Sequence, residues 1–177
     1  ACSGFLYGMS NASNMIASGR YKKVLLIGAD KMSSIVDYTD RTTCVIFGDG
    51  AGAVLFEPSK SGYGWEDEYF RSDGNGRMFL NIKAGGSMHP TSTVTLKKGM
   101  HNLYQDGKTV FKYAVSEMTN VAEKIMHRNG LDAENIAYFV PHQANKRIID
   151  AIAKRIGLPL EKVMSNIEYF GNTTAAT

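Results

Sequence analysis

Three side chains far apart in this sequence could together carry out chemistry on acyl thioesters. Cys2 lies in the opening segment ACSGF, His142 in a PHQAN segment, and Asn172 in the closing segment GNTTAAT. A thiolate can attack a thioester carbonyl, and imidazole and amide N–H groups can stabilise the oxyanion that develops. Each segment lies at the edge of a predicted sheet or helix element. The sequence therefore predicts an acyl-transfer site built from these three residues.

Cys2 is the candidate nucleophile. It precedes a predicted helix over residues 3–18, and the unpaired N–H groups at the amino end of a helix favour a thiolate over a thiol. We therefore expect its pKa to be lowered from about 8.5. The alternative interpretation is that a lone cysteine is a small buried hydrophobe. That alternative is our interpretation of Cys44, which lies within an apolar run.

His142 and Asn172 are the candidate hydrogen-bond donors. His142 follows a predicted strand and precedes a predicted helix, so its imidazole could donate a hydrogen bond to a thioester carbonyl or take part in proton transfer. Asn172 offers an uncharged N–H donor that could help His142 to hold an enolate oxygen. The alternatives are a loop histidine after a proline and a Gly-Asn turn. None of the four histidines stands in a cluster with cysteine or carboxylate side chains, so no metal site is predicted.

The predicted elements alternate between strands and helices, which indicates a layered α/β fold. Helices are predicted from apolar residues at helical spacing, and strands from short apolar runs bounded by glycine, proline or polar residues. The helices are expected at residues 3–18, 108–129 and 144–156, and the strands at residues 23–30, 44–47, 51–56, 137–140 and 163–170. The strand at 23–30 is expected to be covered on both faces. Residues 59–107 are interpreted as a strand followed by an irregular excursion.

Composition argues against several classes of protein. The chain has 177 residues, 44% of them hydrophobic, and its 20 Lys and Arg and 17 Asp and Glu are scattered. This pattern argues against disorder and against nucleic-acid binding. No apolar stretch approaches the roughly 18 residues needed to cross a bilayer, and two distant cysteines form no disulfide framework. We therefore expect a cytoplasmic protein that binds neither a membrane nor nucleic acid.

The motifs resemble those of the β-ketoacyl-acyl-carrier-protein synthase III family, in the thiolase superfamily. The three segments occur in the family's order, and FGDGAGA at residues 47–53 is a fourth matching segment. The resemblance implies that Cys2 is the nucleophile of a Cys-His-Asn triad completed by His142 and Asn172. The asparagine distinguishes these synthases from elongating synthases, whose active-site pattern is Cys-His-His, and from thiolases, whose pattern is Cys-His-Cys.

The resemblance also implies an α/β fold of thiolase type, with α-β-α-β-α layers that are incomplete in this chain. Residues 1–58 would form the later part of the amino-terminal repeat, and residues 59–177 the carboxy-terminal repeat without its last strands. The chain is interpreted as a fragment that is inactive by itself. One oxyanion-hole N–H would come from Cys2, and the other from a glycine-rich strand outside the chain.

Four further positions match substrate-binding residues of the family, and a fifth matches a residue that docks the carrier protein. By resemblance, Arg41, Gly107, Phe111 and Asn145 hold the nucleotide and pantetheine arm of the substrate along the tunnel that leads to the active site. Arg147 occupies the place of an arginine that docks the carrier protein. The alternative for Arg147 is a solvated residue on a helix face, which is common for arginine.

The resemblance implies a condensing enzyme that initiates fatty-acid synthesis. An acyl-CoA would acylate the cysteine, and decarboxylation of malonyl-acyl carrier protein would give an enolate that attacks the acyl group. No metal or redox cofactor is expected, and a homodimer is. The alternatives are a related polyketide or quinolone-type synthase and a non-catalytic fragment or degenerate homologue. A papain-like protease also orders Cys, His and Asn, but the Cys-Trp context and the disulfides of that family are absent.

Overall fold

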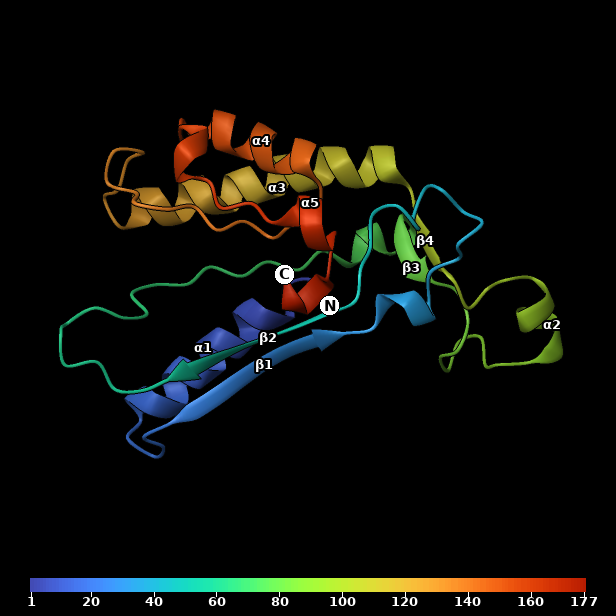
Figure 1. Cartoon of the computed structure of the whole chain (residues 1–177), viewed down its shortest axis with the longest axis horizontal. Helices are drawn as coiled ribbons and strands as arrows, with labels where there is room; N and C mark the ends of the chain where they lie inside the picture. The colour runs from blue at the N-terminus through green and yellow to red at the C-terminus, as the bar shows by residue number, and fades with distance from the viewer.

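The computed structural model describes residues 1–177 and shows a mixed arrangement of helices and short antiparallel strands (Figure 1). The α-helices are α1 (Gly4–Ala17), α2 (Thr93–Lys97), α3 (Gly107–Arg128), α4 (Lys146–Arg155) and α5 (Ile167–Phe170). The strands are β1 (Val24–Asp30), β2 (Gly50–Phe56), β3 (Leu80–Ile82) and β4 (Leu103–Gln105). The short 3-10 helices are η1 (Met32–Ser34), η2 (Gly74–Met78), η3 (Leu160–Lys162) and η4 (Thr174–Ala176). None of the helices combines the length and apolar character that crossing a bilayer would require.

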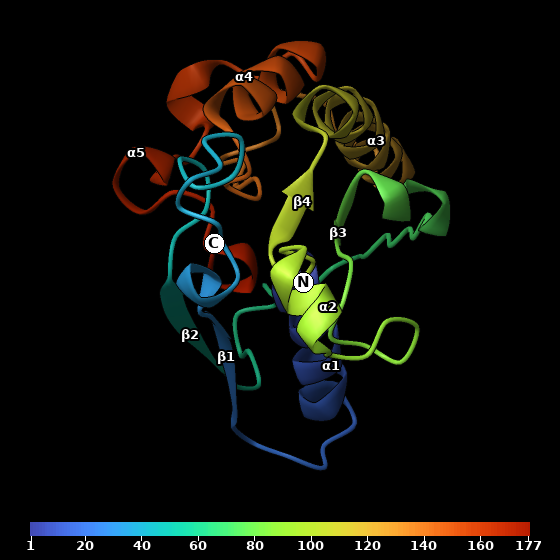
Figure 2. The ribbon, with the colours of Figure 1, turned by 90° about the vertical axis from the view of Figure 1, so that its right-hand side faces the viewer.

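Two groups of elements face each other across the molecule. Helices α3 and α4 lie on one side, α1 and the β1–β2 pair lie on the other, and the carboxyl end of the chain lies between them (Figures 1 and 2). The β1–β2 pair is antiparallel, with Asp30 opposite Gly50. Helix α1 lies very close to β1, since a Cβ atom at Gly8 would lie 2.5 Å from Leu26 Cδ1. A glycine at this position therefore lets the helix approach the sheet.

The outer face of β1 is open. Leu25 and Ile27, which point away from α1, are each 60% exposed. The prediction of a strand covered on both faces is thus wrong for this chain, because no element of residues 1–177 lies over that face. The strand itself was predicted within one residue at its start and at its observed end.

The largest apolar core lies between α3 and α4. The cluster consists of Val115, Ile148, Ile152, Ile156 and Leu158. Both helices were predicted from their spacing to within two residues at each end. Their apolar stripes face each other, which buries the cluster and fixes the two helices as one unit.

The strand predicted at residues 44–47 is a turn. Only Phe47 pairs with another segment, through a single parallel bridge to Asn172. The preceding backbone curls because the Asp40 side chain accepts a hydrogen bond from Thr42 N at 2.9 Å, and Asp40 O accepts one from Cys44 N at 3.0 Å. Such local hydrogen bonds compete with an extended conformation.

The strands predicted at residues 137–140 and 163–170 are also absent. Phe139 and Val163 form one isolated parallel bridge, and the end of the second segment is the helix α5. A strand requires a neighbour that offers N–H and C=O groups along its length. These two segments pair with each other at one position only and with no other strand, so neither extends into a strand.

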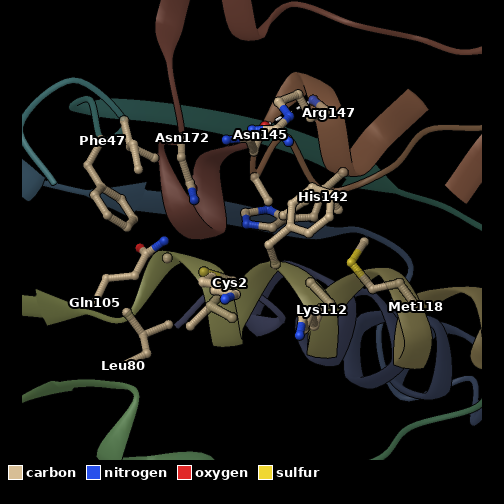
Figure 3. Close-up of a pocket in the computed structure, with 18 residues that line it drawn as sticks. Cys2, Phe47, Leu80, Gln105, Lys112, Met118, His142, Asn145, Arg147 and Asn172 are labelled. Atoms are coloured by element: carbon tan, nitrogen blue, oxygen red, sulfur yellow. Dashed lines mark hydrogen bonds between the residues drawn. The ribbon is translucent and has the colours of Figure 1, made fainter. Parts of the chain in front are cut away.

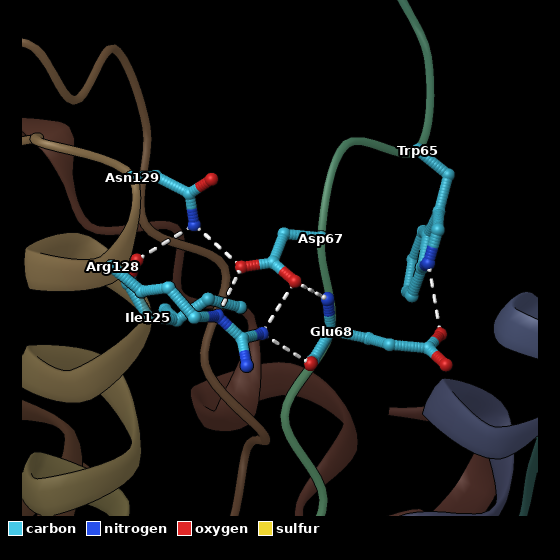
Figure 4. Close-up of polar contacts among 6 residues, drawn as sticks. All are labelled: Trp65, Asp67, Glu68, Ile125, Arg128 and Asn129. Carbon is cyan, nitrogen blue, oxygen red and sulfur yellow. Dashed lines mark hydrogen bonds and ion pairs between the residues drawn. The ribbon is translucent and has the colours of Figure 1, made fainter.

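Residues 59–107 are more ordered than predicted. Strands β3 and β4 pair in antiparallel fashion within this region. Residues 65–68 are attached to the end of α3, where Asp67 accepts hydrogen bonds from Arg128 Nε at 2.7 Å and from Asn129 Nδ2 at 2.6 Å (Figure 4). The segment therefore ties the region after β2 to the α3–α4 side of the molecule.

Candidate functional site

A cavity of about 630 Å³ lies between the two sides of the molecule (Figure 3). Its walls come from the amino end of the chain, the turn before β2, the first half of α3 and the PHQAN loop. Cys2, His142 and Asn172 all line it, and their side chains point into a common space. The fold thus brings together three residues that are separated by up to 170 positions in the sequence.

Cys2 lies just before α1 and is half-buried in the wall of the cavity. Burial raises the pKa of its thiol, and the negative charge of Asp30 acts in the same direction. The amino-terminal charge of the chain and a hydrogen bond from the Cys2 backbone lower it, but they do not compensate. The expectation of a lowered pKa is therefore wrong for this structure, because desolvation of the thiolate outweighs the favourable helix terminus. The Cys2 side chain is therefore a thiol, which would have to lose its proton before its sulfur could act as a nucleophile.

His142 is a neutral imidazole at neutral pH. Burial, assisted by the positive charge of the chain's amino terminus, lowers its pKa from 6.5 to about 4. A neutral imidazole has one N–H donor and one acceptor nitrogen. It can therefore accept the Cys2 proton in one step and donate a hydrogen bond to a substrate oxygen in another.

Gln143 fixes the loop that carries His142. Its side chain is 4% exposed, and its Nε2 donates to Pro141 O at 2.9 Å and to Met164 O at 3.2 Å. Its Oε1 accepts from Asn166 N at 3.0 Å. One amide thus satisfies three backbone groups on two segments and holds the end of the 137–140 segment in place.

Asn172 is held through its backbone and its side chain. Its N–H donates to Ile46 O at 2.8 Å, and its carbonyl accepts from Gly48 N at 3.0 Å. The side-chain Oδ1 accepts from Thr174 N at 2.9 Å, so the amide NH₂ is the end left to face the cavity (Figure 3). A side chain at Gly171 would lie 2.8 Å from Ile46 O, on a backbone with φ of 66°, so the approach to this position requires glycine.

Of the four predicted substrate-binding residues and the predicted docking residue Arg147, all but Arg41 also line the cavity. They are Gly107, Phe111, Asn145 and Arg147. The Arg147 guanidinium lies 5.3 Å from the centre of the Phe111 ring. Asn145 also caps α4, since its Oδ1 accepts from Arg147 N at 2.9 Å. Arg41 differs from these four: it is exposed on the 41–46 turn and does not contribute to the cavity wall.

The sequence did not single out the residues that support the trio. Gln143 lies inside a recognised motif, but its side-chain contacts depend on residues 164–166. Asp30 ends β1 and reaches residues 174 and 175, and this contact has no signal in the local sequence beyond a carboxylate after an apolar run. For metals, no group of three or more His, Cys, Asp or Glu side chains is arranged to hold an ion.

Two family models match the chain. Residues 1–74 match the model described as 3-oxoacyl-[acyl-carrier-protein (ACP)] synthase III. Residues 126–177 match the model described as 3-oxoacyl-[acyl-carrier-protein (ACP)] synthase III C terminal. The two models occur in this order and leave the middle of the chain between them unmatched.

Curated relatives match over the whole chain. It is 56% identical over 177 residues to β-ketoacyl-[acyl-carrier-protein] synthase III 2 of Bacteroides thetaiotaomicron, a match that covers 100% of this chain and 53% of the relative. It is 57% identical over 179 residues to β-ketoacyl-[acyl-carrier-protein] synthase III of Chlorobium chlorochromatii, covering 100% of this chain and 54% of the relative. The chain therefore spans about half the length of the curated relatives it matches.

Solved structures agree in fold. A β-ketoacyl-[acyl-carrier-protein] synthase III from Thermus thermophilus superposes with a TM-score of 0.85 at 37% identity, covering 99% of this chain and 54% of that chain. The priming β-ketosynthase from the R1128 polyketide biosynthetic pathway gives 0.80 at 31% identity, covering 99% and 52%.

Proposed function

Because the chain belongs to the β-ketoacyl-[acyl-carrier-protein] synthase III family, we propose that the protein is a condensing enzyme that initiates fatty-acid synthesis. The fold is the thiolase-like α/β fold, and these residues form an incomplete version of it. The observation that carries the proposal is the convergence of Cys2, His142 and Asn172 on one cavity. A thiol, a neutral imidazole and an oriented amide donor are the groups that acyl transfer followed by condensation needs.

The first proposed step is acylation of Cys2. The sulfur attacks the carbonyl carbon of an acyl-CoA, the bond between that carbon and the CoA sulfur breaks, and CoA leaves as a thiol after it takes up the proton that Cys2 has lost. His142 is suited to accept the Cys2 proton, because burial keeps its imidazole neutral. The raised pKa of Cys2 makes such help necessary. The Cys2 N–H would supply one donor to the oxyanion.

The second proposed step is condensation. Malonyl-acyl carrier protein loses carbon dioxide, and the electron pair of the broken C–C bond forms an enolate. The N–H of His142 and the NH₂ of Asn172 would donate hydrogen bonds to the enolate oxygen and so stabilise the negative charge that develops on it. The enolate carbon then attacks the acyl carbon, the C–S bond to Cys2 breaks, and a β-ketoacyl carrier protein leaves. The substrate thioesters supply this chemistry, so the proposed reaction uses no metal or redox cofactor.

The substrate arm is proposed to lie along the α3 side of the cavity. Gly107, Phe111 and Asn145 would contact the pantetheine there, with Arg41 near the outer, nucleotide end. Arg147 would dock the carrier protein. This role is supported by the position of Arg147, whose exposed guanidinium lies over the Phe111 ring at the cavity. An arginine at this position can bind a phosphate with two parallel hydrogen bonds.

Residues 1–58 and 59–177 are proposed to belong to the two repeats of the complete enzyme, and two copies are proposed to form a homodimer. The division at 58 is supported by the end of β2 at Phe56 and by Pro58 just after it. The polyketide alternative is less favoured, because the curated relatives that match at 56% and 57% identity are both named β-ketoacyl-[acyl-carrier-protein] synthase III.

Intact mass spectrometry tests the proposal most directly. The protein, purified as its gene encodes it, would be treated with acetyl-CoA and with longer and branched acyl-CoA thioesters. We expect one acyl group to be added, lost in Cys2→Ala and kept in the matched variant Cys44→Ala. An adduct that still forms in Cys2→Ala would contradict the assignment of Cys2 as the nucleophile. Absence of any adduct with all of these thioesters would contradict the function.

A further inference from the structure

Asp30 is a carboxylate that contacts the segment after Asn172. It ends β1, and its Oδ2 accepts hydrogen bonds from the Thr174 hydroxyl and, at 2.9 Å, from Ala175 N. None of the four ion pairs of the structure includes it. Its charge is therefore balanced by donors of η4 rather than by a cationic side chain.

Thr174 has an unusual backbone conformation. Its φ of 55° makes it the only residue other than glycine with a positive φ. This conformation is disfavoured for a β-branched side chain, so the surrounding contacts must hold it. The hydroxyl contact with Asp30 is a side-chain contact that does so. Close approach of η4 to β1 is possible because Gly28 has no Cβ, which would lie 2.3 Å from Ala175 O.

The same residue orients Asn172. Thr174 N donates to Asn172 Oδ1 at 2.9 Å, and this bond directs the amide NH₂ of Asn172 toward the cavity. Two hydrogen bonds thus connect a carboxylate on β1 with the proposed enolate donor. If Thr174 relaxed to a negative φ, its N–H would turn away and the Asn172 amide would lose the contact that fixes its orientation.

We infer that Asp30 is a positioning residue for condensation, which holds Thr174 in its left-handed conformation and thereby fixes the Asn172 amide. This inference rests on the proposed function, since it assigns Asn172 the role of an enolate donor. It predicts a defect confined to the second step: acylation of Cys2 needs no Asn172 donor, whereas decarboxylation and condensation do.

Asp30 has a second, electrostatic effect on the site. Its negative charge acts on Cys2 and raises the pKa of the thiol. Removal of the Asp30 charge should therefore shift Cys2 reactivity toward lower pH, a change that simple loosening of the fold would not produce.

The test compares Asp30→Asn with Asp132→Asn in the protein as its gene encodes it. Asp132 is a matched control, because it also accepts backbone hydrogen bonds but lies in the exposed loop after α3. Three rates are measured: acetylation of Cys2 by acetyl-CoA, condensation with malonyl-acyl carrier protein, and alkylation of Cys2 by iodoacetamide as a function of pH.

For Asp30→Asn we expect acetylation within about threefold of the unsubstituted protein and condensation reduced about 10- to 100-fold, in the range for a displaced oxyanion donor. The alkylation profile should shift to lower pH. Asp132→Asn should change none of these. Thr174→Val removes the hydroxyl and should reproduce the condensation defect, whereas Thr174→Ser should retain the activity. The Asp30→Asn and Thr174→Val effects should not add, because both break one chain of contacts.

The outcomes separate the two proposals. If the unsubstituted protein is acetylated but does not condense, the proposed function fails before Asp30 is tested. If it condenses and Asp30→Asn equals Asp132→Asn in condensation and alkylation, the positioning role is overturned. If Asp30→Asn does not fold by circular dichroism, Thr174→Val decides, and normal condensation by that variant overturns the role.

Discussion

Different interactions stabilise the two sides of the cavity. His142 stands on the side of α3 and α4, where an apolar cluster is buried and the neutral Gln143 amide fixes the loop. Asn172 stands on the side of β1 and β2, where one sheet face is exposed and a carboxylate holds the loop. The first side therefore depends on burial, which also keeps the His142 imidazole neutral, and the second side depends on a charged carboxylate.

The largest effect on the free energy of unfolding is expected in the α3–α4 core, where apolar side chains are most deeply buried. Ile152 is completely buried, and Ile152→Ala should lower the free energy of unfolding by about 4 kcal/mol, because it removes buried methylenes and leaves a cavity. Urea denaturation followed by circular dichroism measures it. A loss below about 1 kcal/mol would show that the core refills and would remove the contrast with the sheet side.

The next effect concerns the charge state of His142. Its pKa of about 4 in the folded protein lies below its ordinary 6.5, so the unfolded state binds the proton more readily. The corresponding stability is present above pH 6.5, falls as the pH drops toward 4, and amounts to about 3 kcal/mol at about 1.4 kcal/mol per pKa unit.

Urea denaturation at pH 7.5 and pH 4.5 would measure this dependence. The substitution His142→Gln should flatten the profile between these pH values, whereas the matched variant His89→Gln, at an exposed position, should leave it as it was. Asp30 contributes in a different window: its pKa is lowered by the Thr174 hydroxyl, so its stabilisation is lost only at lower pH. An unchanged profile in His142→Gln would contradict a neutral, buried imidazole.

A smaller effect is expected from the amide that fixes the PHQAN loop. Gln143→Ala should lower the free energy of unfolding by about 2 kcal/mol, because this side chain is 4% exposed and makes three hydrogen bonds, to backbone groups of residues 141, 164 and 166. Gln105→Ala is the matched control, since its side chain lines the cavity without a hydrogen bond to the rest of the chain. Equal losses in both variants, by urea denaturation, would mean that the amide contacts contribute nothing specific.

The two sides also differ in how far the sequence predicts them. Helical spacing located α3 and α4, because their apolar stripes are a local property of the chain. The segments at 44–47 and 163–170 were assigned as strands, because an apolar run does not reveal whether a partner strand is available. The motifs identified the residues that line the site, but the supports at Asp30 and Gln143 act across 144 and 21 positions. Contacts of that range are set by the fold, and no local period signals them.

The smallest effect is expected on the open face of β1. Leu25→Ala removes the same type of apolar group as Ile152→Ala, but Leu25 is already 60% exposed, so the loss should be at most about 0.5 kcal/mol in this chain. Urea denaturation at two protein concentrations would measure this loss and show whether it depends on association between copies of the chain. A loss above about 1.5 kcal/mol that grows with concentration would mean that a second copy covers this face. Because burial determines the cost of removing an apolar side chain, that result would make the sheet side resemble the helical core and would remove the difference between the two sides.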